Sequence, residues 1–423
     1  MVSMGLNIGM IDVDLLNNGT RHPNLAQMKM SAYCKERGHN TQLVYLPEHL
    51  DNLEQYDVLL VSKVFNFTNL PPQLQKLINE TGTLEELNST SVAKVIEDCE
   101  NNTPQKTVIQ LGGTGFFDHG GTRLDLDIEL HFPDYQLYMP YVDYMVNVKM
   151  RERSYFNDYT DCFIGFVTRG CPRKCGFCVL RFHPGCKYHA HPSTFVDLND
   201  KSRKRILLWD DNVLSYPKSN EVFDQLDSMG LPFQFRQGLD IRFITDEKAE
   251  RISKCRYFGD FIFAFDHWKD REIITQKLDI WRAHCKRETK LYLLTGYDAR
   301  CVTDSDSYIK EGNTVDEKDR IDILRTFKRI KILLEHQCLP YIMRFQDYKV
   351  SKYKGMYTQL ARWCNQPSIF KKMSFREFVI RNLDYVKGDE CASTRALKIF
   401  LDDYPDFPDE LLDMKWTDYV QAS

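Results

Sequence analysis

Five cysteines gather in one stretch of the chain, and the spacing of three of them is suited to metal binding. The five are Cys162, Cys171, Cys175, Cys178 and Cys186. Three of these, Cys171, Cys175 and Cys178, share one short segment that follows a predicted strand. Three thiolates on one loop can bind three irons of a cubane cluster and leave the fourth iron without a protein ligand. An open iron can bind a substrate or cofactor, so this spacing predicts a [4Fe-4S] site that does chemistry.

Two other interpretations of the cysteine cluster remain open. In the first, the thiols form a structural zinc site together with Cys186 or with the nearby His183, His189 and His191. Zinc ribbons usually pair two C-x2-C knuckles, and only Cys175 and Cys178 form such a knuckle here. In the second, Cys186 is the fourth ligand of an electron-transfer iron–sulfur protein.

The composition narrows the classes of partner. The chain has 423 residues, 43% of them hydrophobic, and a formal net charge of -4. Nucleic acid is not indicated, because a domain that binds it is usually basic. No apolar run of about 18 residues is present, and the start lacks the features of a signal peptide. We therefore expect a cytoplasmic protein without a membrane partner. In a reducing compartment the scattered cysteines should be small buried hydrophobic residues: Cys34, Cys99, Cys255, Cys285, Cys301, Cys338, Cys364 and Cys391.

The first 150 residues alternate between predicted strands and helices. Strands are predicted at residues 7–12, 41–46, 58–64 and 106–111, with a helix at 23–37. This alternation predicts a Rossmann- or flavodoxin-like open parallel sheet with helices on both faces. A ligand site would lie at the carboxyl ends of the strands, next to Asp12, Gly112, Gly113 and Gly115.

A second alternating series follows a connector at about residues 116–160. Strands are predicted at 163–168, 206–209, 233–236, 261–265, 291–295 and 341–344. Six strands with helices between them predict a partial (β/α)6 barrel over residues 151–348, since a complete barrel needs eight units. Residues 349–423 should form a helical extension. Its basic, aromatic stretch, which includes Trp363, fits either an anionic partner or an ordinary helix face with buried rings.

The cysteine segment resembles the signature of the radical S-adenosylmethionine (SAM) superfamily, C-x3-C-x-aromatic-C after the first strand of a partial barrel. The resemblance implies that Cys171, Cys175 and Cys178 bind a [4Fe-4S] cluster and that SAM chelates its open iron. It also implies that Phe177 lies near the adenine. An external one-electron reductant of flavodoxin or ferredoxin type would reduce the cluster, and cleavage of SAM would generate a 5′-deoxyadenosyl radical.

The same resemblance implies further SAM contacts after the later strands. Asp210, Asp211 and Asn212 stand where the family has a glycine- and glutamate-rich motif that contacts the SAM amino group, and this sequence departs from that pattern. A carboxylate there can still accept from an ammonium group. The remaining candidates follow the third, fourth and fifth strands: Gln237, Asp240, Asp266 and Gly296.

The N-terminal segment resembles the cobalamin-binding-type domain that precedes some radical SAM barrels. The usual cobalt-ligating motif D-x-H-x-x-G is missing, and we expect His22 and His39 to be surface histidines. The resemblance nevertheless makes cobalamin a candidate cofactor. If cobalamin is bound, methylation is the leading reaction. Methylthio transfer is disfavoured, since that subclass carries a second cluster on N-terminal cysteines and only Cys34 and Cys99 precede Cys162. The sequence does not indicate the substrate.

Overall fold

The computed structural model describes residues 5–300, 309, 314–385 and 388–420 and divides the chain into two compact units. Unit 1 comprises residues 1–170, 179–210 and 224–234, and unit 2 comprises residues 171–178, 211–223 and 235–423. The predicted cluster cysteines therefore belong to unit 2, although the strand before them belongs to unit 1. Cys301 lies outside the described residues. The predicted division at residues 150 and 348 does not follow these unit edges and stays a prediction.

Unit 1 begins with the predicted open parallel sheet. Its strands lie in the order β2-β1-β3-β4, and each neighbouring pair is parallel. Their bounds are β1 Asn7–Asp12, β2 Asn40–Leu43, β3 Val58–Ser62 and β4 Val108–Gly112. From β1 the chain adds β2 on one side and then β3 and β4 on the other, so a topological switch point lies between β1 and β3. Open α/β sheets bind ligands in the crevice at such a switch point.

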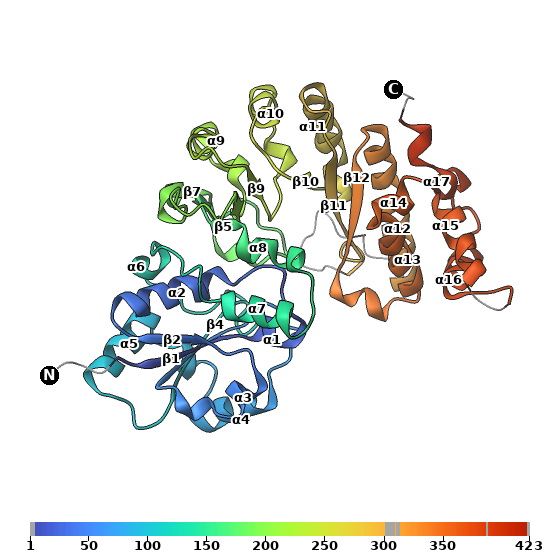
Figure 1. The fold of residues 1–423 in the computed structure, drawn as a ribbon. Coiled ribbons are helices and arrows are strands. Elements are labelled where there is room, and N and C mark those ends of the chain that lie inside the picture. Colours follow the sequence, from blue (N-terminus) through green and yellow to red (C-terminus); the bar gives the residue numbers. More distant parts are fainter. Residues whose placement is uncertain (1–4, 301–308, 310–313, 386–387, 421–423) are drawn as a thin grey trace. The chain divides into compact units, whose positions relative to one another are not determined.

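Helices cover both faces of this sheet (Figure 1). The helix α2 (Leu25–Glu36) begins at Asn24, whose side chain accepts hydrogen bonds from two backbone N–H groups of its first turn. The buried amide of Gln27 then ties α2 to the sheet, donating to the carbonyls of Ile11 and Leu60. The helix α4 (Pro72–Thr81) buries Leu74 and Ile78 in the core of the sheet. The other helices are α1 Val13–Asn18, α3 Pro47–Leu50 and α5 Val92–Asn101.

The expected connector at residues 116–160 is more ordered than the sequence suggested. It contains three helices, α6 Leu126–Glu129, α7 Met139–Asn147 and α8 Asn157–Thr160. Tyr138, Tyr141 and Tyr159 are buried there, and the ring of Tyr159 contacts those of the other two. These aromatic residues form a packed layer, which explains why a segment rich in Tyr and Pro lacks a regular hydrophobic period.

All six strands predicted for the second series are present. The strands β5 Cys162–Gly165, β8 Arg205–Leu208 and β9 Phe233–Phe235 form one sheet in the order β5-β8-β9. The strands β10 Phe261–Ala264, β11 Thr289–Thr295 and β12 Leu339–Arg344 form another, with both of its strand pairs parallel. A small antiparallel ribbon, β6 Thr168–Arg169 with β7 Lys187–Tyr188, was not predicted. Closure of the two sheets into one partial barrel stays a prediction.

Helices alternate with these strands, as a β/α series requires. They are α9 Ser219–Ser228, α10 Asp246–Ser253, α11 Arg271–His284 and α12 Val315–Glu335. The longest, α12, starts with a capping box in which Thr314 and Glu317 satisfy each other's backbone N–H groups. Its buried Arg329 donates to the carbonyls of Phe265 and Leu294, which lie at the ends of β10 and β11. This arginine therefore ties α12 to the carboxyl ends of β10 and β11.

The C-terminal extension is helical, as predicted. Its helices are α13 Lys354–Cys364, α14 Pro367–Phe370, α15 Phe375–Arg381, α16 Ala392–Asp403 and α17 Asp409–Asp413. The ring of Trp363 is buried, and its Nε1 donates to the carbonyl of Met373 at 3.0 Å. Trp363 is thus a core residue, which favours the ordinary-helix interpretation. Across the described ranges, no helix is both long enough and apolar enough to cross a bilayer.

Candidate functional site: the cysteine loop

The chain enters the cysteine loop through Gly170, at a position where any side chain would be strained. Gly170 has a φ of 92°, in the left-handed region, and a Cβ there would lie 2.0 Å from the carbonyl oxygen of Gly185. The close approach follows from the ribbon of β6 and β7, which brings these two backbone segments together. Gly170 therefore fixes the direction in which the chain runs into Cys171.

The three cysteines lie on one loop and are not in disulfides. Cys171 is 8% exposed, and Cys175 and Cys178 are half-buried. The N–H of Cys178 donates to the carbonyl of Cys175 at 3.0 Å, which closes a tight turn around Phe177. Burial raises the pKa of the Cys175 thiol to about 11, against the lowering effect of the Arg242 charge. Iron binding must displace that proton, as it does for any thiolate ligand.

The sulfur of Cys171 accepts two N–H groups. The backbone N–H of Arg173 donates to it over 3.4 Å, and Nδ2 of Asn212 donates to it over 3.3 Å. Such donors stabilise a thiolate and are common around iron–sulfur clusters, where they influence the reduction potential. The donor set at Cys171 therefore fits a metal-bound sulfur.

A network of charges lies behind Asn212. The second hydrogen of its Nδ2 donates to Oδ2 of Asp240 at 3.3 Å, and Asp240 also accepts from Arg173 and from Arg242. Arg242 makes a further ion pair with Asp270 at 2.7 Å. Burial alone would raise the pKa of Asp240, but the hydrogen bonds of Arg242 and the charges of Arg242 and Arg173 outweigh burial and lower it. Asp240 is therefore a carboxylate at neutral pH.

One polar atom of this network is buried without a partner. Oδ1 of Asn212 makes no hydrogen bond within the described part of the chain, although Asn212 is only 4% exposed. The carboxylate of Asp240 can only accept hydrogen bonds, so it holds the NH2 side of the amide towards itself and leaves Oδ1 pointing elsewhere. A buried orphan acceptor is costly unless a bound group supplies the donor. The ammonium group of SAM would be such a donor, so this residue fits the predicted cofactor.

Aromatic side chains surround Phe177. Its ring centroid lies 5.1 Å from that of Tyr297 and 5.6 Å from that of His267. His267 in turn lies 2.9 Å from Asp298, measured from Nδ1 to a carboxylate oxygen, and both residues are buried. This His–Asp pair was not among the predicted site residues, and neither were Arg173, Arg242 and Asp270. The adjacency of His267 and Asp298 to the ends of β10 and β11 was the available signal.

The other predicted SAM-contact residues differ in burial and in their hydrogen-bond partners. Asp210 lies in unit 1, and its carboxylate accepts from the backbone N–H groups of Val167 and Thr168 and from the Thr168 hydroxyl. Gln237 is exposed, and Asp211 and Asp266 are half-buried. Gly296 has a φ of 78°, and its N–H donates to the buried Asp322. The structure thus brings Cys171, Asn212 and Asp240 together, whereas Asp210 contacts the segment that follows the neighbouring strand β5.

The zinc interpretation needs several ligands that converge on one point. Within the described residues no group of three or more His, Cys, Asp or Glu side chains converges closely enough to hold a metal ion. A cubane instead needs its thiolates at three separate corners, so this finding does not count against it. The histidines of the zinc alternative have local contacts: His183 with Arg123, His189 with Glu129 and His191 with Ser193.

At the N-terminal sheet, three of the four predicted loop residues have structural roles. A Cβ at Gly113 would lie 2.3 Å from the Lys63 carbonyl oxygen, and one at Gly115 would lie 2.9 Å from the same atom. Asp12 accepts from Tyr138 at 3.0 Å, and burial raises the pKa of its carboxyl to about 6. Gly112 differs from these, since a Cβ there would meet nothing within 4 Å. Space beside the sheet's carboxyl edge is therefore open at Gly112.

The expectation that His39 is a surface residue is wrong. His39 is 7% exposed, its Nδ1 accepts from the N–H of Leu6, and its Nε2 lies 2.9 Å from Glu100. The histidine satisfies backbone and carboxylate groups at the start of β2, a role that the local sequence does not reveal. His22 is partly exposed and packs its ring against Trp209.

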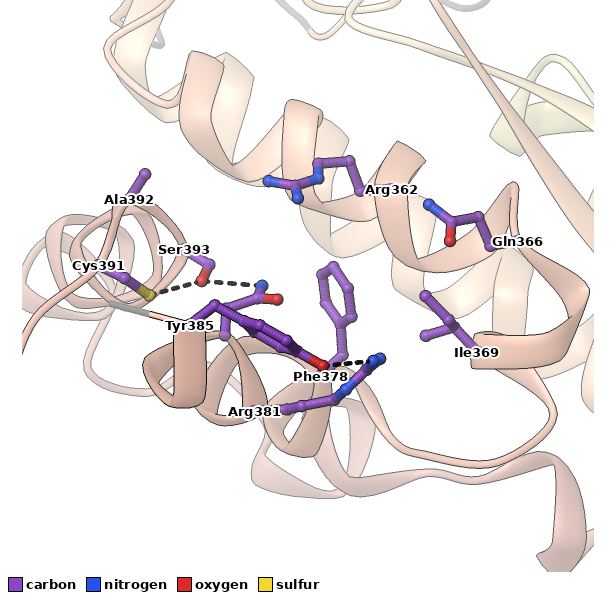
Figure 2. Close-up of a pocket in the computed structure, with 10 residues that line it drawn as sticks. Arg362, Gln366, Ile369, Phe378, Arg381, Tyr385, Cys391, Ala392 and Ser393 are labelled. Atoms are coloured by element: carbon purple, nitrogen blue, oxygen red, sulfur yellow. Dashed lines mark hydrogen bonds between the residues drawn. The ribbon is translucent and has the colours of Figure 1, made fainter. Parts of the chain in front are cut away.

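A pocket of about 370 Å³ lies among the C-terminal helices (Figure 2). It is lined by residues of α13 to α16, including Arg362, Arg381 and Cys391, and contains none of the predicted site residues. Burial raises the pKa of the Cys391 thiol, but hydrogen bonds from Ser393 and Thr394 outweigh burial and lower it to about 7. Arg381 donates to the hydroxyl of Tyr385 at 2.9 Å.

Comparison with known proteins gave matches to solved structures only. No family model and no curated protein matches the chain. Two solved structures of TsrM, a radical SAM methyltransferase from Kitasatospora setae, are similar to it. The first contains cobalamin and a [4Fe-4S] cluster, and it has 10% identity and a TM-score of 0.48 over 81% of this chain and 75% of that one. The second contains tryptophan and a SAM analogue, with 11% identity and a TM-score of 0.47 over 80% and 73%. At TM-scores below 0.5 this similarity adds nothing to what the chain's own residues indicate.

Proposed function

We propose that this chain is a radical SAM enzyme whose [4Fe-4S] cluster is held by Cys171, Cys175 and Cys178. The observation that carries the proposal is the loop itself: three cysteines outside any disulfide, with N–H donors already directed at the Cys171 sulfur. When bound, the reduced cluster would supply the electron that cleaves SAM to methionine and a 5′-deoxyadenosyl radical. The protein's own contribution is to bind and orient the cluster and SAM and to exclude water from the site.

The residues around the loop have roles that suit this function. The orphan Oδ1 of Asn212 would accept a hydrogen bond from the SAM amino group. Phe177, held between Tyr297 and His267, would offer its ring to the adenine. Asp240, Asp270, Arg173 and Arg242 together carry two negative and two positive charges, so they would hold Asn212 in place without adding net charge at the site.

The test is anaerobic reconstitution with iron and sulfide, followed by dithionite and SAM. We expect 5′-deoxyadenosine from the wild type and none from Cys171→Ala, Cys175→Ala or Cys178→Ala. Cys162→Ala is the matched control, because Cys162 is a buried core residue of β5 whose removal leaves the loop cysteines in place. A fully loaded cluster that cleaves no SAM would refute the proposal.

The same experiment separates the two rival functions. If Cys186 were the fourth ligand of an electron-transfer cluster, Cys186→Ser would lose the cluster, whereas our proposal predicts that it keeps the cluster. A zinc-stabilised binding module would yield a colourless protein with stoichiometric zinc after purification. Iron–sulfur absorbance near 400 nm and the iron content distinguish these outcomes directly.

We further propose that the N-terminal sheet binds cobalamin and that the reaction is a methylation. The supporting observation is a pair of exposed aromatic rings directly after β3. Phe65 and Phe67 are 48% and 72% exposed and stack with centroids 5.2 Å apart, at the same carboxyl edge as the open space beside Gly112. Exposed apolar surface of this kind commonly marks a binding site.

Cobalamin binding can be measured without any substrate. Hydroxocobalamin titrated into the anaerobic protein should bind with a change in its visible spectrum, and Phe65→Ala combined with Phe67→Ala should weaken binding at least tenfold. Phe182→Ala, an exposed phenylalanine outside the N-terminal sheet, is the matched control. Equal affinity in the double variant and the control would rule out this site.

A further inference from the structure

The environment of Cys171 has a consequence for electron transfer that goes beyond cluster binding. Cys171 is the most buried of the three loop cysteines, and its sulfur accepts a hydrogen bond from Nδ2 of Asn212 at 3.3 Å. We propose that Asn212 is a positioning residue that raises the reduction potential of the cluster through this N–H···S hydrogen bond. The inference rests on the proposed [4Fe-4S] cluster at this loop.

The physical reason lies in where the added electron resides. Reduction makes the cluster and its cysteine sulfurs more negative, and an N–H dipole directed at a sulfur stabilises the more negative state. Burial strengthens the effect, because a low local dielectric weakens an electrostatic interaction less than water does. Asn212 is 4% exposed, so its amide lies in such surroundings.

The orientation of the amide is fixed by its second hydrogen bond. Nδ2 donates at the same time to Oδ2 of Asp240, at 3.3 Å. A flipped amide would place Oδ1 against this carboxylate, with two acceptors facing each other, and would lose both donors. Asp240 therefore keeps an N–H of Asn212 on the sulfur in every state of the cluster.

The charge of Asp240 would by itself lower the potential, and two guanidinium groups offset it. Arg242 donates to Asp240 through Nε at 2.7 Å, and Arg173 donates through Nε at 3.3 Å. Arg242 is shared with Asp270, so the four side chains carry two positive and two negative charges. Because these four charges sum to zero, the network acts on the Cys171 sulfur through the N–H dipole of Asn212.

The experiment is a potentiometric titration of the reconstituted full-length protein without SAM, followed by EPR of the reduced cluster. Asn212→Leu removes both donors at similar volume, and Asn212→Asp removes them and adds a negative charge. We expect the potential to fall in the order wild type, Asn212→Leu, Asn212→Asp. At a fixed ambient potential, the ratio of reduced to oxidised cluster should fall about tenfold in Asn212→Leu, which is 59 mV for a one-electron couple.

The control is Asn220→Leu, since Asn220 lies in the same segment and donates to Glu247 rather than to a sulfur. Its potential should equal that of the wild type. Iron and sulfide contents measured on each variant identify any change in loading. Potentials that are equal in all four proteins overturn the inference and leave the proposed function intact, whereas a wild type that binds no cluster overturns the proposed function.

A second measurement does not depend on the variants. Pulsed EPR of the reduced wild-type cluster, in protein labelled with side-chain 15N-asparagine, should show a 15N coupling transmitted through the hydrogen bond to the Cys171 sulfur. Arg173 donates to the same sulfur through its backbone N–H, which this label leaves unchanged. A loaded, reduced cluster without 15N coupling overturns the inference even where the Asn212 variants fail to fold.

Discussion

Gly170→Ala places one methyl group at the entrance of the cysteine loop, and the structure allows its cost to be estimated. Two effects add. The φ of 92° is unfavourable for alanine by about 1–2 kcal/mol. The new Cβ would also lie 2.0 Å from the backbone carbonyl oxygen of Gly185, far inside van der Waals contact. Backbone must move to relieve such a contact, which typically costs about 1–3 kcal/mol.

We therefore expect Gly170→Ala to lower the free energy of unfolding by about 2–5 kcal/mol. Gly185→Ala separates the two effects, because Gly185 also has a positive φ, 78°, but a Cβ there would meet nothing within 4 Å. That variant should lose only about 1–2 kcal/mol, from backbone strain alone. Gly112→Ala has neither a positive φ nor a close neighbour and should be nearly neutral.

The assay is urea unfolding of the metal-free proteins, followed by circular dichroism, with the slope of the transition compared across the three variants. Cluster loading is then measured after reconstitution, and it should fall in Gly170→Ala more than in Gly185→Ala, because displaced backbone carries Cys171 with it. Equal unfolding midpoints for Gly170→Ala and Gly185→Ala would refute the close approach on which this reasoning depends.

Three further predictions test other parts of the chain. Burial raises the pKa of Asp12 to about 6, from 3.8, so folding favours the protonated form and this group's contribution to stability is present below about pH 4 and lost as the pH rises through 6. Asp12→Asn should remove that decline, a difference of about 3 kcal/mol in the free energy of unfolding between pH 4 and pH 7 relative to wild type. Equal pH profiles would contradict it. Arg203 donates to the carbonyls of Tyr159, Cys162 and Tyr135. Arg203→Ala should cost at least about 3 kcal/mol in urea unfolding, against less than about 0.5 kcal/mol for the exposed Lys201→Ala. Phe177→Ala should keep the cluster but weaken SAM binding about tenfold in equilibrium dialysis, with Phe67→Ala unchanged. Undiminished SAM affinity would remove Phe177 from the adenine site.

Much of the architecture followed from local sequence. All ten predicted strands occur in the structure, because runs such as residues 58–61 are continuously apolar and end at polar or glycine-rich segments. The three loop cysteines were predicted as ligands from their spacing and from the family resemblance, since residues on one short loop are near each other whatever the rest of the chain does. Asn212 and Asp240 were selected because the resemblance to the radical SAM superfamily implies SAM contacts at their positions, after the second and third strands of the second series.

Tertiary structure decided which of those side chains face the cysteine loop and which are hydrogen-bonded elsewhere in the protein. Asp210 and Asn212 are two residues apart. Even so, Asp210 accepts a hydrogen bond from the N–H of Thr168, whereas Asn212 donates one to the Cys171 sulfur. His39 is buried rather than exposed because Glu100 and the N–H of Leu6, both distant in sequence, supply its partners. The His267–Asp298 pair joins the ends of two strands in the same way. Sequence patterns record which face or end of an element a residue occupies, but the partner of a buried polar group is set by segments that only the fold brings within hydrogen-bonding distance.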